Sequence, residues 1–205
     1  MIEGIMAGLI LSLSLFPGTV WLVRVGFVGR PNQVVAVGAG FLVAQLFWLI
    51  VAVPGLMMMC RHLSMISFAM HAFAALTLFY LSVKFFRTRP ADHLDPGVIL
   101  LPPAVLFRSA FSQSFAIPMR LPAAMAIVLA TGVYTNHVPS REIVLSILFG
   151  SLIGVIWWWG KITLLSVAFA KRVPEPITLK SLNKIRPFCG VLFLVLTGLV
   201  LFFGL

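Results

Sequence analysis

Six apolar segments, each about as long as a bilayer is thick, dominate this sequence. A helix needs about 20 apolar residues to cross the hydrocarbon core, whereas a strand of a membrane barrel needs only about 9–11. The chain of 205 residues is 61% hydrophobic, well above the roughly 45–50% of soluble domains. We therefore predict an all-α membrane protein with one transmembrane domain over residues 1–205. Its six helices are expected at about residues 4–24, 34–59, 65–86, 107–131, 143–170 and 187–205.

The basic residues are unevenly distributed among the connections between these segments. The second and fourth connections carry only Arg61 and Arg141. Because Lys and Arg near helix ends mark the cytoplasmic side, we predict a multi-pass membrane protein with both termini outside. The net charge of +10 then reflects topology and contact with anionic lipids of the bilayer, not a nucleic-acid partner. The other connections hold eleven: Arg24, Arg30, Lys84, Arg87, Arg89, Arg108, Lys171, Arg172, Lys180, Lys184 and Arg186.

Three predicted helices lie on each side of a proline-rich cytoplasmic connection over residues 88–106. We divide the chain into halves, 1–87 and 107–205, and an odd number of helices in each half requires the second half to be inverted. The stretch SLSLFPG at residues 12–18 is similar to SQSFAIP at residues 112–118, in the corresponding helix of the other half. Paired interruptions in corresponding helices of inverted halves are typical of a transporter's binding site.

Each of these two stretches has serines before a proline. Proline has no amide hydrogen, so we predict that Pro17 leaves the carbonyl of Leu13 without its helical partner and that Pro118 does the same to Ser114. The hydroxyls of Ser14 and Ser114 are then available to repair the backbone or to contact a ligand. The alternative, that these residues only kink the helices, stays open at this stage.

Two cations fall inside the predicted helices. Arg120 lies about 13 residues into its helix, near the midplane, and Lys161 lies roughly 15 Å from the inner surface. A charge at the helix centre costs about 2.5–3.5 kcal/mol and usually faces the bundle interior with a partner. We predict that Arg120 binds a substrate carboxylate with help from Lys161, whose alternative is to extend toward the interface. The five acidic residues lie only at segment ends or in connections: Glu3, Asp92, Asp95, Glu142 and Glu175.

Other chemistry is weakly indicated. His71, in the third helix, is the candidate for coupling transport to protons, although a buried structural histidine is the more common case. Asp92, His93 and Asp95 resemble a solvated loop more than a metal site. Cys60 and Cys189 fall on opposite membrane faces, so no disulfide is expected. We find no nucleophile–base pair in the sequence, so an enzyme is disfavoured. No cofactor or metal is expected.

Glycine pairs at four-residue spacing occur in the first and fifth helices, at Gly4 and Gly8 and at Gly150 and Gly154. Such pairs let helices approach closely. We predict packing within the bundle, with a homodimer contact as the alternative.

Several longer stretches carry a family resemblance: LSLSLFPGTVWLVRVGFVGR, FYLSVKFFR, FRSAFSQSFAIPMR, WWWGKITLLSVAFAKRV and IRPFCGVLFLVLTGLVLFFGL. In this order and spacing, over nearly the whole chain, they resemble the lysine exporter (LysE/RhtB) family of bacterial amino-acid exporters. The resemblance implies a six-helix exporter of the bacterial cytoplasmic (inner) membrane. The family's proline-glycine-proline motif corresponds to Pro17, Gly18 and, as a departure, Thr19. Gln45 stands where the family commonly has an acidic residue. Ile117 and Met119 replace the family's asparagine and lysine beside the second proline.

These observations favour a secondary transporter that exports a small amino acid or a related carboxylate by alternating access. The alternative is a non-transporting membrane partner or assembly protein on the same scaffold. The predicted substrate-binding residues are Ser14, Pro17, Gly18, Gln45, Ser114, Pro118, Arg120 and Lys161, with His71 as the coupling candidate.

Overall fold

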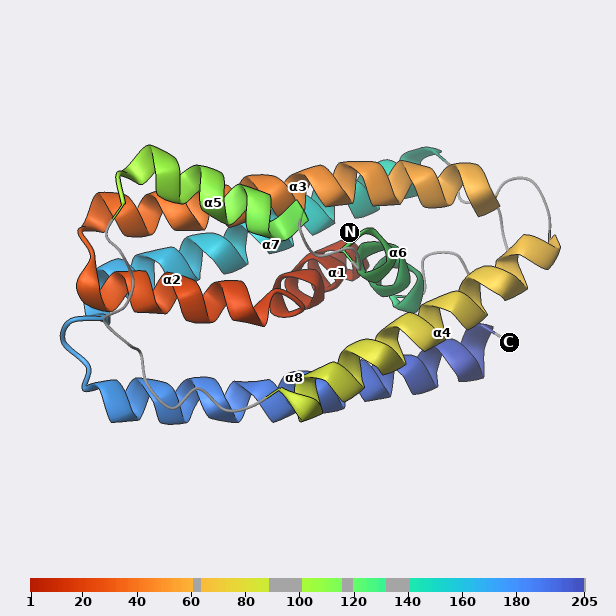
Figure 1. Cartoon of the computed structure of the whole chain (residues 1–205). Helices are drawn as coiled ribbons and strands as arrows, with labels where there is room; N and C mark the ends of the chain where they lie inside the picture. Colours follow the sequence, from red (N-terminus) through yellow and green to blue (C-terminus); the bar gives the residue numbers. More distant parts are fainter. Residues whose placement is uncertain (61–63, 89–100, 116–119, 132–140, 205) are drawn as a thin grey trace.

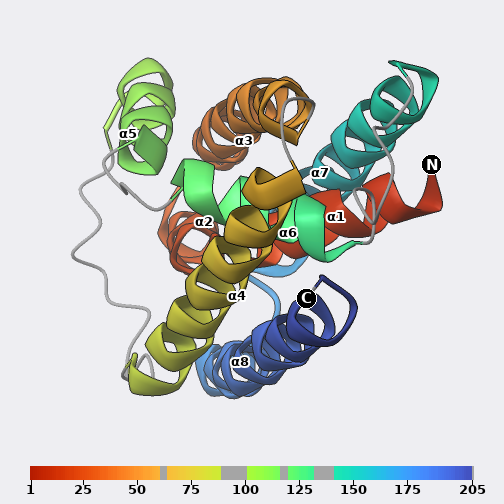
Figure 2. The ribbon, with the colours of Figure 1, turned by 90° about the vertical axis from the view of Figure 1, so that its right-hand side faces the viewer.

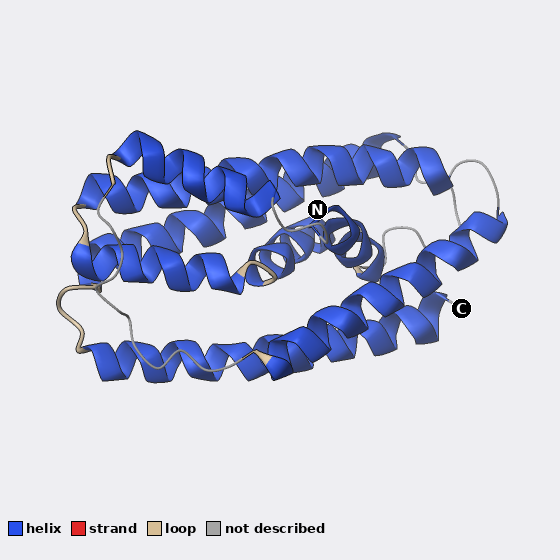
Figure 3. Cartoon of the chain, viewed as in Figure 1, coloured by secondary structure: helices blue, strands red, loops and turns tan. Residues whose placement is uncertain are grey.

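The computed structural model describes residues 1–60, 64–88, 101–115, 120–131 and 141–204. Within these ranges the chain forms helices joined by short turns, and no strand is present (Figure 3). The predicted all-α class is confirmed for this part of the chain. The helices are α1 (Ile2–Leu13), α2 (Phe16–Val28), α3 (Pro31–Cys60), α4 (Ser64–Arg87), α5 (Pro103–Phe115), α6 (Arg120–Ala130), α7 (Arg141–Phe169) and α8 (Glu175–Gly204).

Four of the described helices, α3, α4, α7 and α8, are long and apolar enough to cross a membrane individually. Two further candidates are bent pairs: α1 meets α2 at 66°, and α5 meets α6 at 69°. The described residues therefore contain four membrane-length helices, or up to six if each bent pair is one span. This composition agrees with a multi-pass membrane protein.

The long helices α3, α4, α7 and α8 run along the length of the molecule, as do the shorter α2 and α5 (Figure 1). In contrast, α1 and α6 lie across the middle of the bundle, which is clearest in the turned view (Figure 2). Helix α1 packs on α7, α5 packs on α3, and α4 packs on α8. The bend between α1 and α2 therefore lies inside the protein, where Ser14, Leu15 and Phe16 are buried.

The contact between α1 and α7 is made by glycines from both helices. A Cβ atom added at Gly4 or Gly8 would collide with the backbone of α7, and one added at Gly150 or Gly154 would collide with the backbone of α1. Only glycine permits this separation between the two helix axes. The prediction that these pairs serve packing within the bundle is confirmed, and we call this contact the glycine seam.

Candidate functional site

The first bent pair breaks between Leu13 and Phe16. Leu15 has non-helical dihedral angles, φ −97° and ψ 35°, and its N–H bonds to the Ser12 carbonyl at 3.1 Å. Pro17 lies in the first turn of α2, where an amide hydrogen has no helical acceptor and proline is well tolerated. The break therefore precedes the proline that predicted it.

One carbonyl that loses its helical partner at this break is that of Leu11. In a regular helix it would accept the N–H of Leu15, which has turned to Ser12 instead. Two side chains replace that donor: Ser14 Oγ donates to the Leu11 oxygen at 2.6 Å, and Gln45 Nε2 donates to it at 3.1 Å. Sequence reasoning expected an unpaired carbonyl at Leu13, whereas the side-chain repair occurs two residues earlier.

Gln45 links three helices around this repaired carbonyl. Its side chain is 1% exposed, and its Oε1 accepts the indole N–H of Trp159 at 2.8 Å and the hydroxyl of Ser12 at 3.0 Å. An indole nitrogen can only donate, so it fixes the orientation of the amide. We call the group of Ser12, Gln45, Trp159 and the Leu11 carbonyl the Gln45 brace. It ties α1 to α3 and α7.

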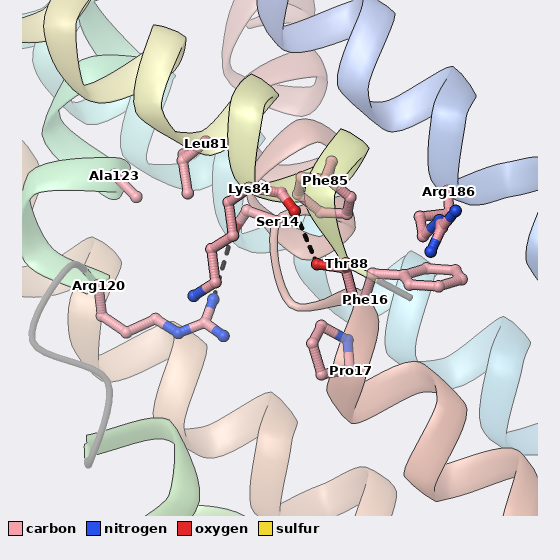
Figure 4. Close-up of a pocket in the computed structure, with 10 residues that line it drawn as sticks. All are labelled: Ser14, Phe16, Pro17, Leu81, Lys84, Phe85, Thr88, Arg120, Ala123 and Arg186. Carbon is pink, nitrogen blue, oxygen red and sulfur yellow. Dashed lines mark hydrogen bonds between the residues drawn. The ribbon is translucent and has the colours of Figure 1, made fainter. Parts of the chain in front are cut away.

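On another side of the same break lies a cavity, which we call the cationic cavity (Figure 4). It has a volume of about 60 Å³, which is room for several water molecules or a small chemical group. Three of its lining residues are cationic, and none of the described lining residues is acidic. The lining residues are Ser14, Phe16, Pro17, Leu81, Lys84, Phe85, Thr88, Arg120, Ala123 and Arg186.

Arg120 is the most deeply buried of the three cations. It is the first residue of α6 and is 5% exposed. Its Nη1 donates to Ser14 Oγ at 3.3 Å, while its Nε is buried without a hydrogen-bond partner among the described residues. The N-terminus of a helix carries a partial positive charge, which disfavours a cation and favours an anion. Arg120 therefore adds to a positive potential that no described carboxylate neutralises.

Arg186 and Lys84 complete the positive lining. Arg186, on α8, is half-buried, and its Nε and Nη1 have no hydrogen-bond partner within the described part of the chain. Lys84 is exposed at the end of α4 and extends into the cavity on the Arg120 side (Figure 4). The sequence pattern predicts only a topological role for both cations. A basic residue near a helix end looks the same in the sequence whether it marks the cytoplasmic side or lines a cavity.

The predicted site residues lie in several places. Ser14, Pro17 and Arg120 line the cationic cavity, and Gly18 is buried in the first turn of α2 against Leu15 and Phe41. Gln45 belongs to the brace rather than to the lining. A predicted residue that the structure does not describe is Pro118, which lies in the segment 116–119.

Three other predicted residues lie away from the lining. Lys161 is exposed on α7, where its Nζ lies 4.6 Å from the centre of the Trp157 ring. His71 is buried in α4 and engaged in an interaction there. Ser114 is fully buried at the end of α5, and its hydroxyl has no partner among the described residues. The structure therefore does not bring Lys161 or His71 to the cavity.

Comparisons of the chain with protein-family models, with curated proteins and with solved structures find no match. Among the residues described, no cluster of three His, Cys, Asp or Glu side chains could hold a metal ion. Asp92, His93, Asp95 and the side chain of Cys60 lie outside the described part. What the cavity offers chemically is a set of cationic and hydroxyl donors beside an apolar wall. Such a set suits an anionic group.

Proposed function

We propose that the protein is a secondary transporter that exports a small amino acid or a related carboxylate across the cytoplasmic membrane of a bacterium by alternating access. The observation that carries the proposal is Arg120, which is 5% exposed and has an unpartnered Nε within the described residues. A buried guanidinium is costly without a counter-charge. A carboxylate entering the cavity provides that charge through two parallel hydrogen bonds.

The arrangement of the helices supports six spans in two inverted halves. The first half contains α1 to α4, and the second contains α5 to α8. The first element of each half packs on the second span of the other half, since α1 contacts α7 and α5 contacts α3. In addition, α3 contacts α7 and α4 contacts α8, so that corresponding spans pair. A two-fold relation between inverted halves would produce this exchange.

The distribution of charge supports an orientation with both termini outside. The α2–α3 connection, the α7–α8 connection and the start of α5 lie at the same end of the molecule (Figure 1). The first two contain Arg30, Lys171 and Arg172. The positive-inside rule assigns this end to the cytoplasm.

In the proposed mechanism, a substrate carboxylate binds Arg120. The hydroxyl of Ser14 connects Arg120 to the backbone at the helix break. Ser14 already accepts from Arg120 and donates to the Leu11 carbonyl, so it couples the bound anion to the backbone at the break. Phe16 and Phe85 provide the apolar wall for the rest of the substrate. His71 remains the candidate for proton coupling, acting from within α4 rather than from the cavity.

The motif order that resembles the lysine exporter family supports the same proposal. Thr19 occupies the position of the second family proline; its side chain is buried, and its hydroxyl has no hydrogen-bond partner in the described chain. Gln45, at the position of the family's acidic residue, is engaged in the brace. These departures alter the substrate and the coupling ion more readily than they alter the scaffold.

The test is counterflow in proteoliposomes. Vesicles containing the purified protein are loaded with one unlabelled amino acid or carboxylate at a time, and uptake of the labelled compound is measured. We expect uptake of one chemical class, and its loss in Arg120→Gln. Uptake unchanged by this substitution would exclude the proposed site but not transport. No uptake of any compound would favour the membrane partner over the transporter.

A further inference from the structure

We infer that the cationic cavity binds a small organic anion with two negatively charged groups, in preference to a zwitterionic amino acid. The inference rests on the proposed transport function and makes its substrate more specific. Two independent features of the described lining lead to it: the number of cations, and the positions of the unpaired guanidinium donors. Neither the Gln45 brace nor the glycine seam contains any of these cations.

The first feature is the balance of charge. Arg120, Lys84 and Arg186 contribute three positive charges, and the described lining contributes no negative charge. An amino acid brings one carboxylate and one ammonium, so it leaves the total charge unchanged and adds a fourth cationic group. An anion with two carboxylates lowers the total from three to one. Because Arg120 is buried and Arg186 is half-buried, water screens these two charges only partly, and the difference favours the second ligand.

The second feature is the separation of the two guanidinium groups. Arg120 comes from α6 and Arg186 comes from α8, and Figure 4 shows Arg120 next to Lys84 and Arg186 apart from both, near the Phe16 ring. Arg120 has a buried unpartnered Nε, and Arg186 has a buried unpartnered Nε and Nη1, as far as the described residues show. One carboxylate can pair with only one such fork. A ligand with two anionic groups offers one group to each guanidinium.

A substrate ammonium finds little to bind in this lining. The Ser14 hydroxyl donates to Leu11 and accepts from Arg120, and the Thr88 hydroxyl donates to the Lys84 carbonyl at 2.7 Å. The remaining lining side chains are apolar or cationic. An ammonium group would therefore lose its hydration without gaining a carboxylate partner, which is unfavourable in a buried site.

The test compares succinate, a four-carbon dicarboxylate, with alanine, a neutral zwitterion, in counterflow with neutral-lipid vesicles. We expect succinate counterflow to exceed alanine counterflow by about tenfold or more. Arg186→Gln should lower succinate counterflow about tenfold, as loss of one charge-assisted hydrogen bond predicts. Lys180→Gln, an exposed charge on the same helix, serves as the matched control and should leave it unchanged. Alanine counterflow equal to or faster than succinate counterflow would overturn the inference while keeping the transporter.

A binding measurement separates this inference from the proposed function. Succinate should raise the thermal unfolding midpoint of the wild-type protein in neutral detergent, and Arg186→Gln should make that increase smaller at the same succinate concentration. This result without counterflow would retain the dianion site and reject transport. The same experiment with phosphatidylglycerol identifies the source of the anion. Stabilisation by phosphatidylglycerol and not by succinate, or by neither compound, would overturn the inference.

Discussion

The Gln45 brace and the cationic cavity lie on two sides of one helix break, yet they treat buried polar groups in opposite ways. In the brace, Gln45 Oε1 and Nε2 both make hydrogen bonds, and so do the Trp159 indole and the Leu11 carbonyl. In the cavity, Arg120 and Arg186 keep buried donor atoms without a partner among the described residues. The cost of burying such donors is not recovered within the described chain.

This difference suggests separate roles for the two sides of one polar region. A satisfied network holds α1, α3 and α7 in one arrangement. Under the proposed function, the unsatisfied donors of the cavity would gain their missing hydrogen bonds when an anion binds. Substitutions on the two sides should therefore affect different quantities, and four of them test the comparison, beginning with the largest expected effect.

On the cavity side, Arg120→Gln should lower counterflow of the transported anion about 100-fold, as loss of a buried charge partner typically does. The free energy of unfolding without ligand should stay constant or increase, because an unpaired buried charge has been removed. Counterflow and thermal unfolding of the same preparation check both parts. Arg108→Gln, the same change at an exposed position of α5, is the control. A loss of stability with Arg120→Gln would mean that Arg120 is structural.

On the brace side, Gln45→Leu should destabilise the protein by about 3 kcal/mol, because it leaves the Trp159 indole without its acceptor and removes a donor from the Leu11 carbonyl. Thermal unfolding in detergent measures this effect. Gln113→Leu provides the comparison, since Gln113 is exposed on α5. Equal stability of the two variants would contradict the structural role of the brace.

The glycine seam predicts a smaller loss. Gly8→Ala puts a methyl group against the backbone of Ser151 and should lower the free energy of unfolding by about 2 kcal/mol. Gly160→Ala is the matched control on α7, because a Cβ at Gly160 meets no atom within 4 Å. That change should be neutral or stabilise the helix by up to about 1 kcal/mol. The comparison fails if Gly8→Ala is as stable as Gly160→Ala.

The smallest effect is expected at Lys161. Its ammonium is exposed and rests on Trp157, a contact that contributes about 0.5–1 kcal/mol at such sites. Lys161→Gln should change counterflow by less than about twofold, since Lys161 does not line the cavity. A reduction comparable to that of Arg120→Gln would restore the sequence-based hypothesis that both cations bind substrate.

The sequence predicted those features that depend on local physical constraints. Long apolar runs determine helices, so the all-α class follows directly. The stretch SLSLFPG predicted a broken helix, and a 66° bend lies within it. Four-residue glycine spacing predicted a close helix contact. Arg120 was singled out because the sequence offers no acid within a predicted helix to pair with it.

Other features depend on tertiary contacts that no local pattern encodes. Lys84 and Arg186 are about 100 positions apart in the sequence and line the same cavity only because α4 packs on α8. The hydrogen bond between Trp159 and Gln45 also joins distant segments. The carbonyl that side chains repair is that of Leu11, because the helix breaks before Pro17. The nearby side chains of Ser14 and Gln45 supply the hydrogen bonds.

The glycine seam also restricts how the molecule can move. Its glycines lie against the backbone of the opposite helix, so α1 cannot slide or roll on α7 without steric collision. The Gln45 brace fixes the other end of α1 to α3 and α7. If the protein transports by alternating access, we expect α1 to stay fixed on α7 and α2 to move about the break at Ser14–Leu15. In that motion a ligand in the cavity would stay against α1, and the movement of α2 with Phe16 and Pro17 would open the cavity on one side.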